Sequence, residues 1–165
     1  MSALFYSHLA DSPVGPLLLA GDADALHVLS FGNGIRPREI DADWARDTKG
    51  VLETVRRELK EYFAGRLKSF TVPLAFTGTP FQNAVWKQLT RIPYGETISY
   101  LELANRIDNP KAVRAVGMAN GANPIAIIVP CHRVIGSNGS LTGFGGGLPA
   151  KRALLELEKG QRTLL

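Results

Sequence analysis

Short apolar runs alternate with turn residues at the start of the chain. The runs cover residues 4–10, 17–20 and 26–31. Ser12-Pro13-Val14-Gly15 and Gly21-Asp22-Ala23-Asp24 separate them, and such clusters of Pro, Gly and Asp are typical of tight turns. The pattern predicts a three-stranded antiparallel meander. The polar residues 32–47, which include Gly and Pro, predict a long loop after it.

A helix is expected next, because apolar residues recur with helical spacing at Leu52, Val55, Leu59, Tyr62 and Phe63. Gly65 supplies a C-terminal stop. The segment 70–74 contains a proline and predicts a short edge strand. Residues 1–76 therefore predict an α+β unit, a small antiparallel sheet with a helix. It contains no cluster of catalytic residue types.

Sequence signals for the N-termini of three helices follow residue 77, where the pattern of the chain changes. Thr79-Pro80 predicts an N-cap with proline at the first helical position. The span Ser99 to Glu102 has the form of a capping box and predicts a short helix. Asn109-Pro110 predicts the cap of a further helix that ends at about Asn120. The last two helices would meet at a turn of about three to four residues, the outline of a helix-turn-helix.

Small side chains dominate the helix predicted after Asn109-Pro110. Ala112, Ala115 and Ala119 are predicted to share one face, beside Gly117. A helix that reads bases by hydrogen bonds carries Arg, Asn or Gln on such a face, and here the face offers Arg114. The pattern indicates close shape contact with a duplex. An alanine-rich helix packed on both sides explains it equally well.

The stretch 123–136 holds the only cysteine of the chain. The apolar run 125–129 predicts a buried extended segment. Pro130 keeps the preceding residue out of the helical region, so we expect an extended chain that delivers Cys131 and His132 to the edge of the core. An imidazole next to a thiol is the usual means of forming a nucleophilic thiolate. A buried structural cysteine beside a surface histidine is the alternative.

Glycine dominates the segment after the Cys-His pair. Ser137-Asn138-Gly139-Ser140 predicts a hairpin-type turn, and four glycines follow in residues 142–147. They allow close approach of backbone to a ligand but lack the Lys-Ser/Thr ending of a phosphate loop. The final helix is predicted from Pro149 to Gly160. Glu158 in its last turn opposes the helix dipole. A solvated glutamate could bear this small cost, whereas a glutamate turned inward to hold an imidazole would have a reason to be there.

Composition and charge narrow the class of protein. The 165 residues, 45% of them apolar, suffice for one large or two small domains. A single cysteine excludes an internal disulfide and a Cys-rich zinc site. No signal peptide or membrane-length apolar stretch is evident, so a cytoplasmic protein is expected. Residues 1–76 carry 9 Lys/Arg and 10 Asp/Glu, whereas residues 77–165 carry 10 and 5, so the second part predicts an anionic partner.

Residues 81–160 closely resemble the O6-alkylguanine-DNA alkyltransferases, also called methylated-DNA-protein-cysteine methyltransferases. The shared motifs are Ile92–Thr97, Asn109–Gly117, Asn123-Pro124 and Val129–Val134, of which Val-Pro-Cys-His-Arg-Val is the most specific. The resemblance implies an α+β protein with two domains. Residues 1–76 would form a ribonuclease H-like domain, matched only in length and order of elements. Residues 77–165 would form a mostly helical, winged-helix-like domain with the helix-turn-helix and the active-site cysteine.

This resemblance implies a monomeric DNA repair enzyme that binds the minor groove and flips O6-alkylguanine out of duplex DNA. O4-alkylthymine is a second candidate substrate, and cooperative binding on DNA is left open. The alkyl group would pass irreversibly to the protein in one turnover, without a cofactor or metal. A stacked base must be extruded before a thiolate can reach its alkyl carbon, and a small-faced helix suits a minor-groove approach. A bacterial-type cytoplasmic protein, associated with the nucleoid on DNA, is implied.

The resemblance implies a role for each residue of this chain that stands at a functional position of the family's motifs. Cys131 would accept the alkyl group, His132 would take the thiol proton through a water, and Glu158 would orient His132. Tyr100 would turn the nucleotide and bond the guanine, and Arg114 would replace the base in the stack. The remaining DNA-binding residues implied are Lys111, Ala112, Ala115 and Gly117. The implied pocket residues are Asn123, Val134 (through its backbone), Phe144, Gly145 and Gly146; many relatives have Tyr at 144 and some have Ser at 145.

Three other functions are compatible with parts of the pattern. A Cys-His hydrolase would need a different spacing from the adjacent pair seen here. A non-catalytic protein that binds alkyl lesions and recruits repair factors would not need Cys131. A metal-binding regulator would need more ligands than two adjacent residues.

Overall fold

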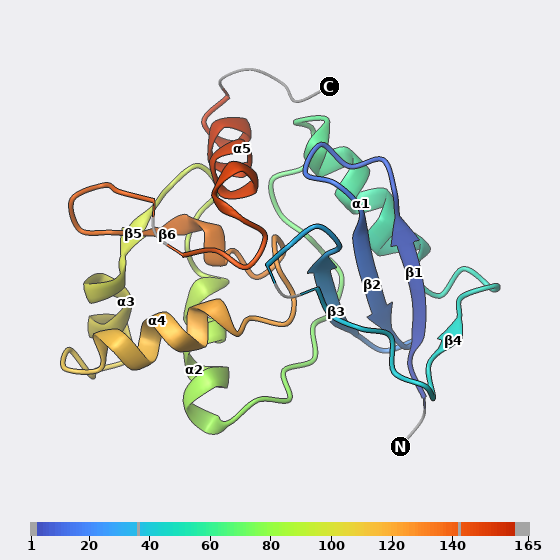
Figure 1. Ribbon diagram of the computed structural model, residues 1–165, viewed down its shortest axis with the longest axis horizontal. Coiled ribbons are helices and arrows are strands. Elements are labelled where there is room, and N and C mark those ends of the chain that lie inside the picture. Colours follow the sequence, from blue (N-terminus) through green and yellow to red (C-terminus); the bar gives the residue numbers. More distant parts are fainter. Residues whose placement is uncertain (1–2, 36, 142, 161–165) are drawn as a thin grey trace.

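The computed structural model describes residues 3–35, 37–141 and 143–160. It confirms the α+β class. A small sheet and helix α1 (Glu53–Phe63) form one side of the molecule, and helices α2 to α5 form the other (Figure 1). The glycine-rich segment is described from Gly143 onward, and Thr142 lies outside the described residues.

The predicted meander is confirmed. Strands β1 (Phe5–Leu9), β2 (Leu17–Gly21) and β3 (Leu26–Phe31) pair antiparallel in that order. The long loop predicted after them is interrupted by strand β4 (Ala45–Arg46), which pairs parallel with β1. Backbone hydrogen bonds from Ala45 to the Leu4 carbonyl and from Asp47 to the Tyr6 carbonyl hold it there. The sheet is therefore mixed, not purely antiparallel, with the order β3-β2-β1-β4.

Helix α1 buries the face that its periodicity predicted, including Val55, Leu59 and Tyr62. The edge strand predicted at 70–74 is reduced to one bridge between Leu26 and Leu74. The cause is Glu58, whose carboxylate accepts from the backbone N–H groups of Thr71 and Val72. Those groups are then unavailable to a neighbouring strand.

The second part consists of short elements. Helix α2 (Pro80–Leu89) starts at Thr79 with a complete capping box closed by Gln82. Strand β5 (Ile98–Ser99) leads into α3 (Tyr100–Arg106), and α4 (Val113–Gly121) follows. Strand β6 (Val134–Ile135) pairs parallel with β5, so the turn at 137–140 closes no hairpin. Helix α5 (Leu148–Glu158) ends the described chain.

The helix-turn-helix has a longer connection than predicted. Helix α4 begins at Val113, and Ala112 precedes it without a side-chain cap. Asn109 is not the cap, because it lies three residues before the N-cap position Ala112, and its own backbone N–H bonds to the carbonyl of Ala104 at the end of α3. Asp108, with a positive φ of 57°, redirects the chain there. The connection therefore runs from residue 107 to residue 112.

One of the three alanines predicted to share a face of α4 points inward. Ala119 is buried, and its carbonyl accepts a hydrogen bond of 2.8 Å from the indole of Trp86 on α2. Ala115 and Arg114 are exposed. The face open to a partner is thus narrower than the sequence pattern predicted.

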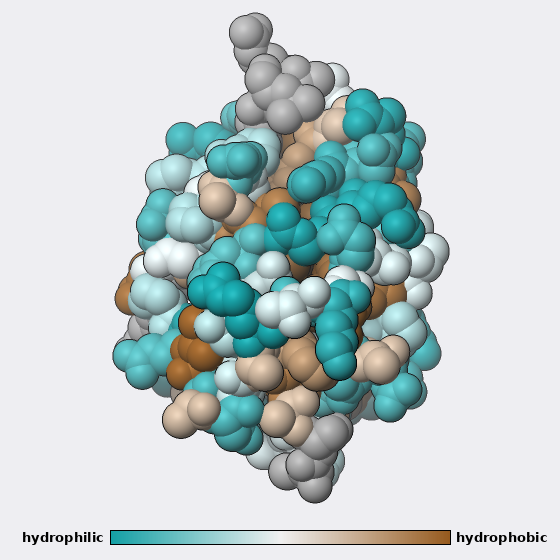
Figure 2. Space-filling model, turned by 90° about the vertical axis from the view of Figure 1, so that its right-hand side faces the viewer, coloured by the Kyte–Doolittle hydropathy of each residue, from teal (hydrophilic) through white to brown (hydrophobic). Residues whose placement is uncertain are grey.

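A single hydrophobic cluster runs through both parts of the molecule. Strand β3 lies at the sheet edge, where Leu29 donates to the carbonyl of Pro124 and accepts from the N–H of Ala126. The view onto the side that carries the sheet is mainly hydrophilic, with apolar residues in separate patches (Figure 2). Among the described residues, no helix is long and apolar enough to cross a membrane.

Candidate active site

The apolar run before Cys131 is buried as predicted, but it is not extended. Ile127 adopts a positive φ of 71°, and the N–H of Val129 bonds to the carbonyl of Ile125. Cys131 itself begins a short 3₁₀ helix that includes His132 and Arg133. The prediction of a strand was wrong because one bridge to Leu29 of β3 ties the run to the sheet and its other hydrogen bonds are local.

Asn123 holds this turn from both sides. Its Nδ2 donates to the carbonyl of Val129 at 2.7 Å, and its Oδ1 accepts from the N–H of Ile125 at 3.0 Å. A left-handed conformation at a β-branched residue costs about 1–3 kcal/mol. The two Asn123 hydrogen bonds, together with the complete burial of Ile127, keep the turn in that conformation.

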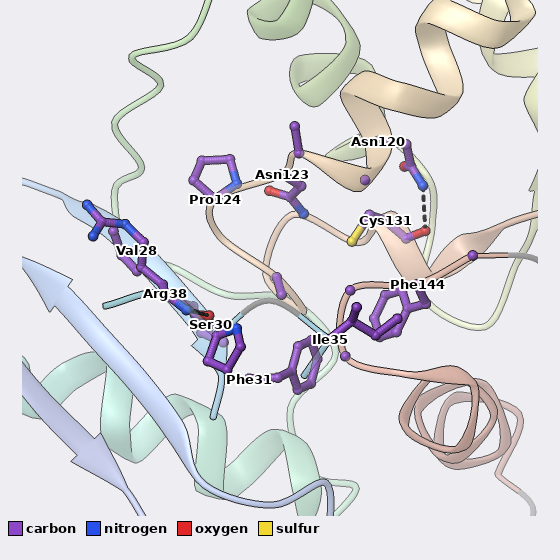
Figure 3. Close-up of a pocket in the computed structure, with 18 of the residues that line it drawn as sticks. Val28, Ser30, Phe31, Ile35, Arg38, Asn120, Asn123, Pro124, Cys131 and Phe144 are labelled. Carbon is purple, nitrogen blue, oxygen red and sulfur yellow. Dashed lines mark hydrogen bonds between the residues drawn. The ribbon is translucent and has the colours of Figure 1, made fainter. Parts of the chain in front are cut away.

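Cys131 lines a cavity of about 780 Å³ between the two parts of the molecule. The sulfur lies beside the Asn123 side chain, while Phe31, Ile35 and Phe144 lie together on another wall (Figure 3). The rings of Phe31 and Phe144 meet edge to face with centroids 5.4 Å apart. Further lining residues include the predicted pocket residues Gly145 and Gly146.

Gly146 is needed for this packing. A Cβ at that position would lie 2.7 Å from the ring of Phe31. The backbone around it also ties the two parts together, because the N–H of Ile35 donates to the Gly145 carbonyl at 2.8 Å. The glycine-rich segment thus forms a wall of the cavity against β3 and the loop after it.

Behind Cys131, a buried set of polar groups surrounds the carboxylate of Glu158. His132 Nε2 lies 2.7 Å from Glu158 Oε2. Arg133 donates to both carboxylate oxygens, from Nε at 2.7 Å and from Nη2 at 2.9 Å. The Nδ1 atom of His132 is buried and has no hydrogen-bond partner among the described residues. This nitrogen is therefore available to exchange a proton.

The protonation states follow from burial and these contacts. Burial raises the pKa of the Cys131 thiol, and burial lowers the pKa of His132 despite the nearby carboxylate. Burial alone would raise the pKa of Glu158, but hydrogen bonds from His132 and Arg133 outweigh it and lower the pKa to about 2. The resting site therefore holds a neutral thiol, a neutral imidazole protonated at Nε2, and an ionised carboxylate.

Lys151 is a site residue that the sequence interpretation missed. Its side chain is fully buried, and Nζ donates to the carbonyl of Val134 at 2.7 Å. Burial lowers the pKa of Lys151, while interaction with Cys131 raises it. A signal was present in the sequence, because Lys151 lies three and seven residues before Leu154 and Glu158 and so on the same inward face of α5.

Val134 does not line the cavity. Its side chain is fully buried, and its carbonyl accepts a hydrogen bond from Lys151 Nζ. The described lining includes a second residue that the sequence interpretation missed, Asn120. Its Nδ2 lies 3.4 Å from the Cys131 carbonyl, while its Oδ1 is buried without a partner among the described residues.

The predicted DNA-binding residues lie at the start of α3, in the connection that precedes α4, and on α4. Lys111, Arg114 and Ala115 are exposed, whereas Ala112 is half-buried. Gly117 faces Tyr100, since a Cβ at that position would lie 3.9 Å from the tyrosine ring. Lys151 Nζ lies 6.0 Å from the centre of the same ring. Tyr100, the first residue of α3, therefore lies close to both α4 and the buried Lys151 of α5. Among the described residues, no three His, Cys, Asp or Glu side chains gather as they would around a metal ion.

Acidification should destabilise the protein through this buried set. His132 has a lowered pKa when folded, so stability is lost as the pH falls below 6.5, the ordinary value. The pKa of Glu158 falls from 4.5 to about 2 on folding. Its contribution to the free energy of unfolding, on the order of 3 kcal/mol, is therefore present above about pH 5 and lost as the pH falls toward 2. Urea unfolding between about pH 7 and pH 3 measures this. The Glu158→Gln variant should lose the lower part of the dependence, and an identical pH dependence in parent and variant would contradict the assignment.

The fold and the site together define an α+β protein with a helix-turn-helix and a cavity-lining thiol that is followed directly in the chain by the histidine of a buried His-carboxylate pair. Residues 80–160 match the 6-O-methylguanine DNA methyltransferase DNA binding domain, and residues 5–76 match the ribonuclease-like domain of the same family. The chain belongs to this 6-O-methylguanine DNA methyltransferase family. The match confirms the family and enzyme class that the sequence motifs predicted.

Individual relatives agree with this assignment. The chain is 54% identical over 153 residues to the methylated-DNA–protein-cysteine methyltransferase of Methanosarcina acetivorans, covering 93% of this chain and 97% of the relative. It is 53% identical over 152 residues to the Mycobacterium tuberculosis protein of the same name, covering 92% and 90%. The crystal structure of Mycobacterium tuberculosis OGT in complex with DNA superposes with a TM-score of 0.87 at 52% identity, covering 94% of this chain and 93% of that one.

Proposed function

We propose that this protein repairs DNA by moving the alkyl group of O6-alkylguanine from the duplex to Cys131, once per molecule. The observation that carries the proposal is the Cys131 thiol, which lines the cavity in front of the buried His132–Glu158 pair. The names of the relatives and the DNA complex of the Mycobacterium tuberculosis protein support the substrate class.

The chemical step uses the groups on either side of His132. Glu158 keeps a proton on Nε2, so Nδ1 accepts the thiol proton through a water. The thiolate sulfur forms a bond to the alkyl carbon as the bond from that carbon to O6 breaks, and the proton that His132 took from the thiol passes through water to the departing guanine. The products are guanine and a thioether, so atoms and charges balance without a co-reactant. Among the residues that the structure describes, no group near Cys131 is of a type that cleaves a thioether, which supports a single turnover.

Formation of the thiolate in a buried site needs compensation. Asn123 and Lys151 both lower the pKa of Cys131, opposing the increase caused by burial. The Lys151 ammonium reaches the site on the buried face of α5. Together they reduce the free energy of placing a negative charge on sulfur.

Access to a stacked base requires extrusion, which we assign to the helix-turn-helix. Arg114 projects as a long exposed cation and would fill the space that the base leaves. Tyr100, which lies close to Gly117 of α4 and to Lys151, would turn the nucleotide at its phosphate. Contacts to the minor groove would come from Lys111, Ala112 and Ala115, with Gly117 allowing Tyr100 to pack closely. Asn123, Phe144, Gly145 and Gly146 would enclose the base. The Val134 carbonyl is bonded to Lys151, so a role for the backbone of Val134 would require that Lys151 release it.

The domain boundary is proposed between residues 76 and 77, which the two family matches support. O4-alkylthymine remains a candidate second substrate. A non-catalytic lesion-binding role is the alternative function, and it is separated from the proposal by whether Cys131 becomes modified.

Intact mass of the protein provides the test. Mixing it with a duplex that contains one O6-methylguanine should add the mass of one methylene, because a methyl replaces the thiol proton. Excess DNA should give no further increase, and peptide analysis should locate the methyl on Cys131. An unmodified protein that still binds the duplex would favour the lesion-binding alternative. An unmodified protein with repeated DNA turnover would favour a hydrolase.

A further inference from the structure

The proposed catalytic set includes a contact from the first part of the molecule. Tyr62 on α1 donates a hydrogen bond of 2.6 Å from its hydroxyl to Glu158 Oε2, across 96 residues of sequence. The side chain is fully buried. A charge-assisted O–H···O⁻ bond of this length is among the stronger hydrogen bonds in proteins.

Packing alone does not require the Tyr62 hydroxyl. The ring sits in an aromatic cluster with Phe63, Phe70 and Tyr94, at centroid distances of 5.4, 5.4 and 6.3 Å. A phenylalanine would make the same ring contacts. The hydroxyl, in contrast, needs a partner because an unpaired buried hydroxyl is costly. The partner it has is the carboxylate that holds His132.

The position of this hydrogen bond determines its consequence. Tyr62 and His132 contact the same carboxylate oxygen, Oε2, while Arg133 bridges both oxygens. Each additional donor fixes the carboxylate more firmly and reduces the negative charge available to the others. Tyr62 therefore affects both where Oε2 lies and how strongly it attracts the proton on His132.

We propose that Tyr62 is a positioning residue for alkyl transfer, supplied by the first domain. Its hydroxyl orients Glu158 and moderates the basicity that Glu158 imposes on His132. The inference rests on the proposed function and deepens it, because it gives the first domain a residue that acts on the chemical step through Glu158.

The Tyr62→Phe variant tests the proposal. Transfer should become about tenfold slower, a modest loss for a hydrogen bond to a charged group. The loss should be equal for the free base O6-benzylguanine and for duplex DNA, since the residue acts on chemistry and not on extrusion. Affinity for DNA should not change.

The pH dependence separates positioning from a merely structural role. The charged groups that act on His132 are Glu158 and Lys151 from α5 and Arg133 from the 3₁₀ helix. Tyr62 and Tyr94 in turn lie near Glu158, but of these two tyrosines Tyr62 is the one that donates a hydrogen bond to the carboxylate. Without the Tyr62 hydroxyl, Oε2 interacts more strongly with the imidazolium and raises the pKa of His132. His132 then becomes protonated at higher pH and can no longer accept the thiol proton. The acidic limb of the rate profile should therefore move to higher pH.

Tyr94→Phe is the matched control. It removes a hydroxyl from the same aromatic cluster, but that hydroxyl lies 3.5 Å from the Leu157 carbonyl and makes no bond to Glu158. Tyr94→Phe should keep the parent rate and profile. In a Glu158→Gln background, Tyr62→Phe should add no further loss, because the two act in series.

Three outcomes would overturn the proposal. The first is a parental transfer rate and pH profile for Tyr62→Phe. The second is a slower Tyr62→Phe variant whose pH profile is unshifted and whose loss of rate is explained by reduced stability. The third is the same loss of rate in Tyr94→Phe. A parent protein that takes up no methyl would instead refute the proposed function. Uptake by the parent, with a parental Tyr62→Phe, would refute the role of Tyr62 alone.

Discussion

Replacement of Cys131 by serine should abolish methyl uptake and leave binding to alkylated DNA intact. A hydroxyl is far harder to ionise than a thiol, and burial already raises the pKa at this position. Loss of the nucleophile from a cooperating set reduces a reaction rate by on the order of 10⁶-fold. The chain contains no second cysteine that could replace it.

Two measurements on the same preparation check this expectation. Intact mass after mixing with O6-methylguanine duplex should show no methylene addition, and fluorescence anisotropy should give the parental affinity. Urea unfolding should establish that the variant folds, because a buried serine hydroxyl costs about 1–3 kcal/mol when it lacks a partner. A labelled methyl on any other residue, in parent or variant, would exclude Cys131 as the sole acceptor.

Arg114→Ala should slow repair of duplex DNA while leaving the reaction with free O6-benzylguanine nearly unchanged. Extrusion of a base costs a few kcal/mol, whereas a free base needs no extrusion. A side chain that offsets about 2 kcal/mol of this cost accounts for roughly a thirtyfold change in rate. Arg114 suits this role because it is an exposed long cation beside the small, exposed Ala115.

The decisive quantity is the ratio of the two rates in parent and variant. Arg66→Ala is a matched control, because it removes the same charge from an exposed arginine that pairs with Glu61 in the first part of the molecule. It should leave both rates at the parental level. An equal loss of rate on both substrates in Arg114→Ala would show that Arg114 supports the fold or the pocket and does not take the place of the extruded base.

Local signals were sufficient to predict several elements and to select Cys131 as the candidate nucleophile. The meander, α1 and the start of α2 were predicted because turn residues, periodicity and an N-cap act within a few residues. Cys131 was identifiable as the only cysteine, and Glu158 because a carboxylate at a helix C-terminus is electrostatically unfavourable there. Each of these inferences needed no knowledge of what packs against the segment.

Other features depended on partners distant in sequence, which only the tertiary structure supplied. The run before Cys131 has the apolar character of a strand, but one bridge to Leu29 and the bonds of Asn123 fold it into a turn. Ala119 was assigned to an open face because periodicity gives direction without identifying Trp86 as its neighbour. The same spacing cannot show that a lysine is buried, as Lys151 is.

The contact between Tyr62 and Glu158 is the clearest case. From the sequence, Tyr62 belongs to the apolar face of one helix and Glu158 to the last turn of another, 96 residues later. The chain alone determined both helices and the inward direction of Tyr62, whereas a solvated Glu158 was equally compatible with the sequence. That the hydroxyl of one meets the carboxylate of the other was decided by how the two parts pack around one shared core, because a hydrogen bond requires both partners within about 3 Å.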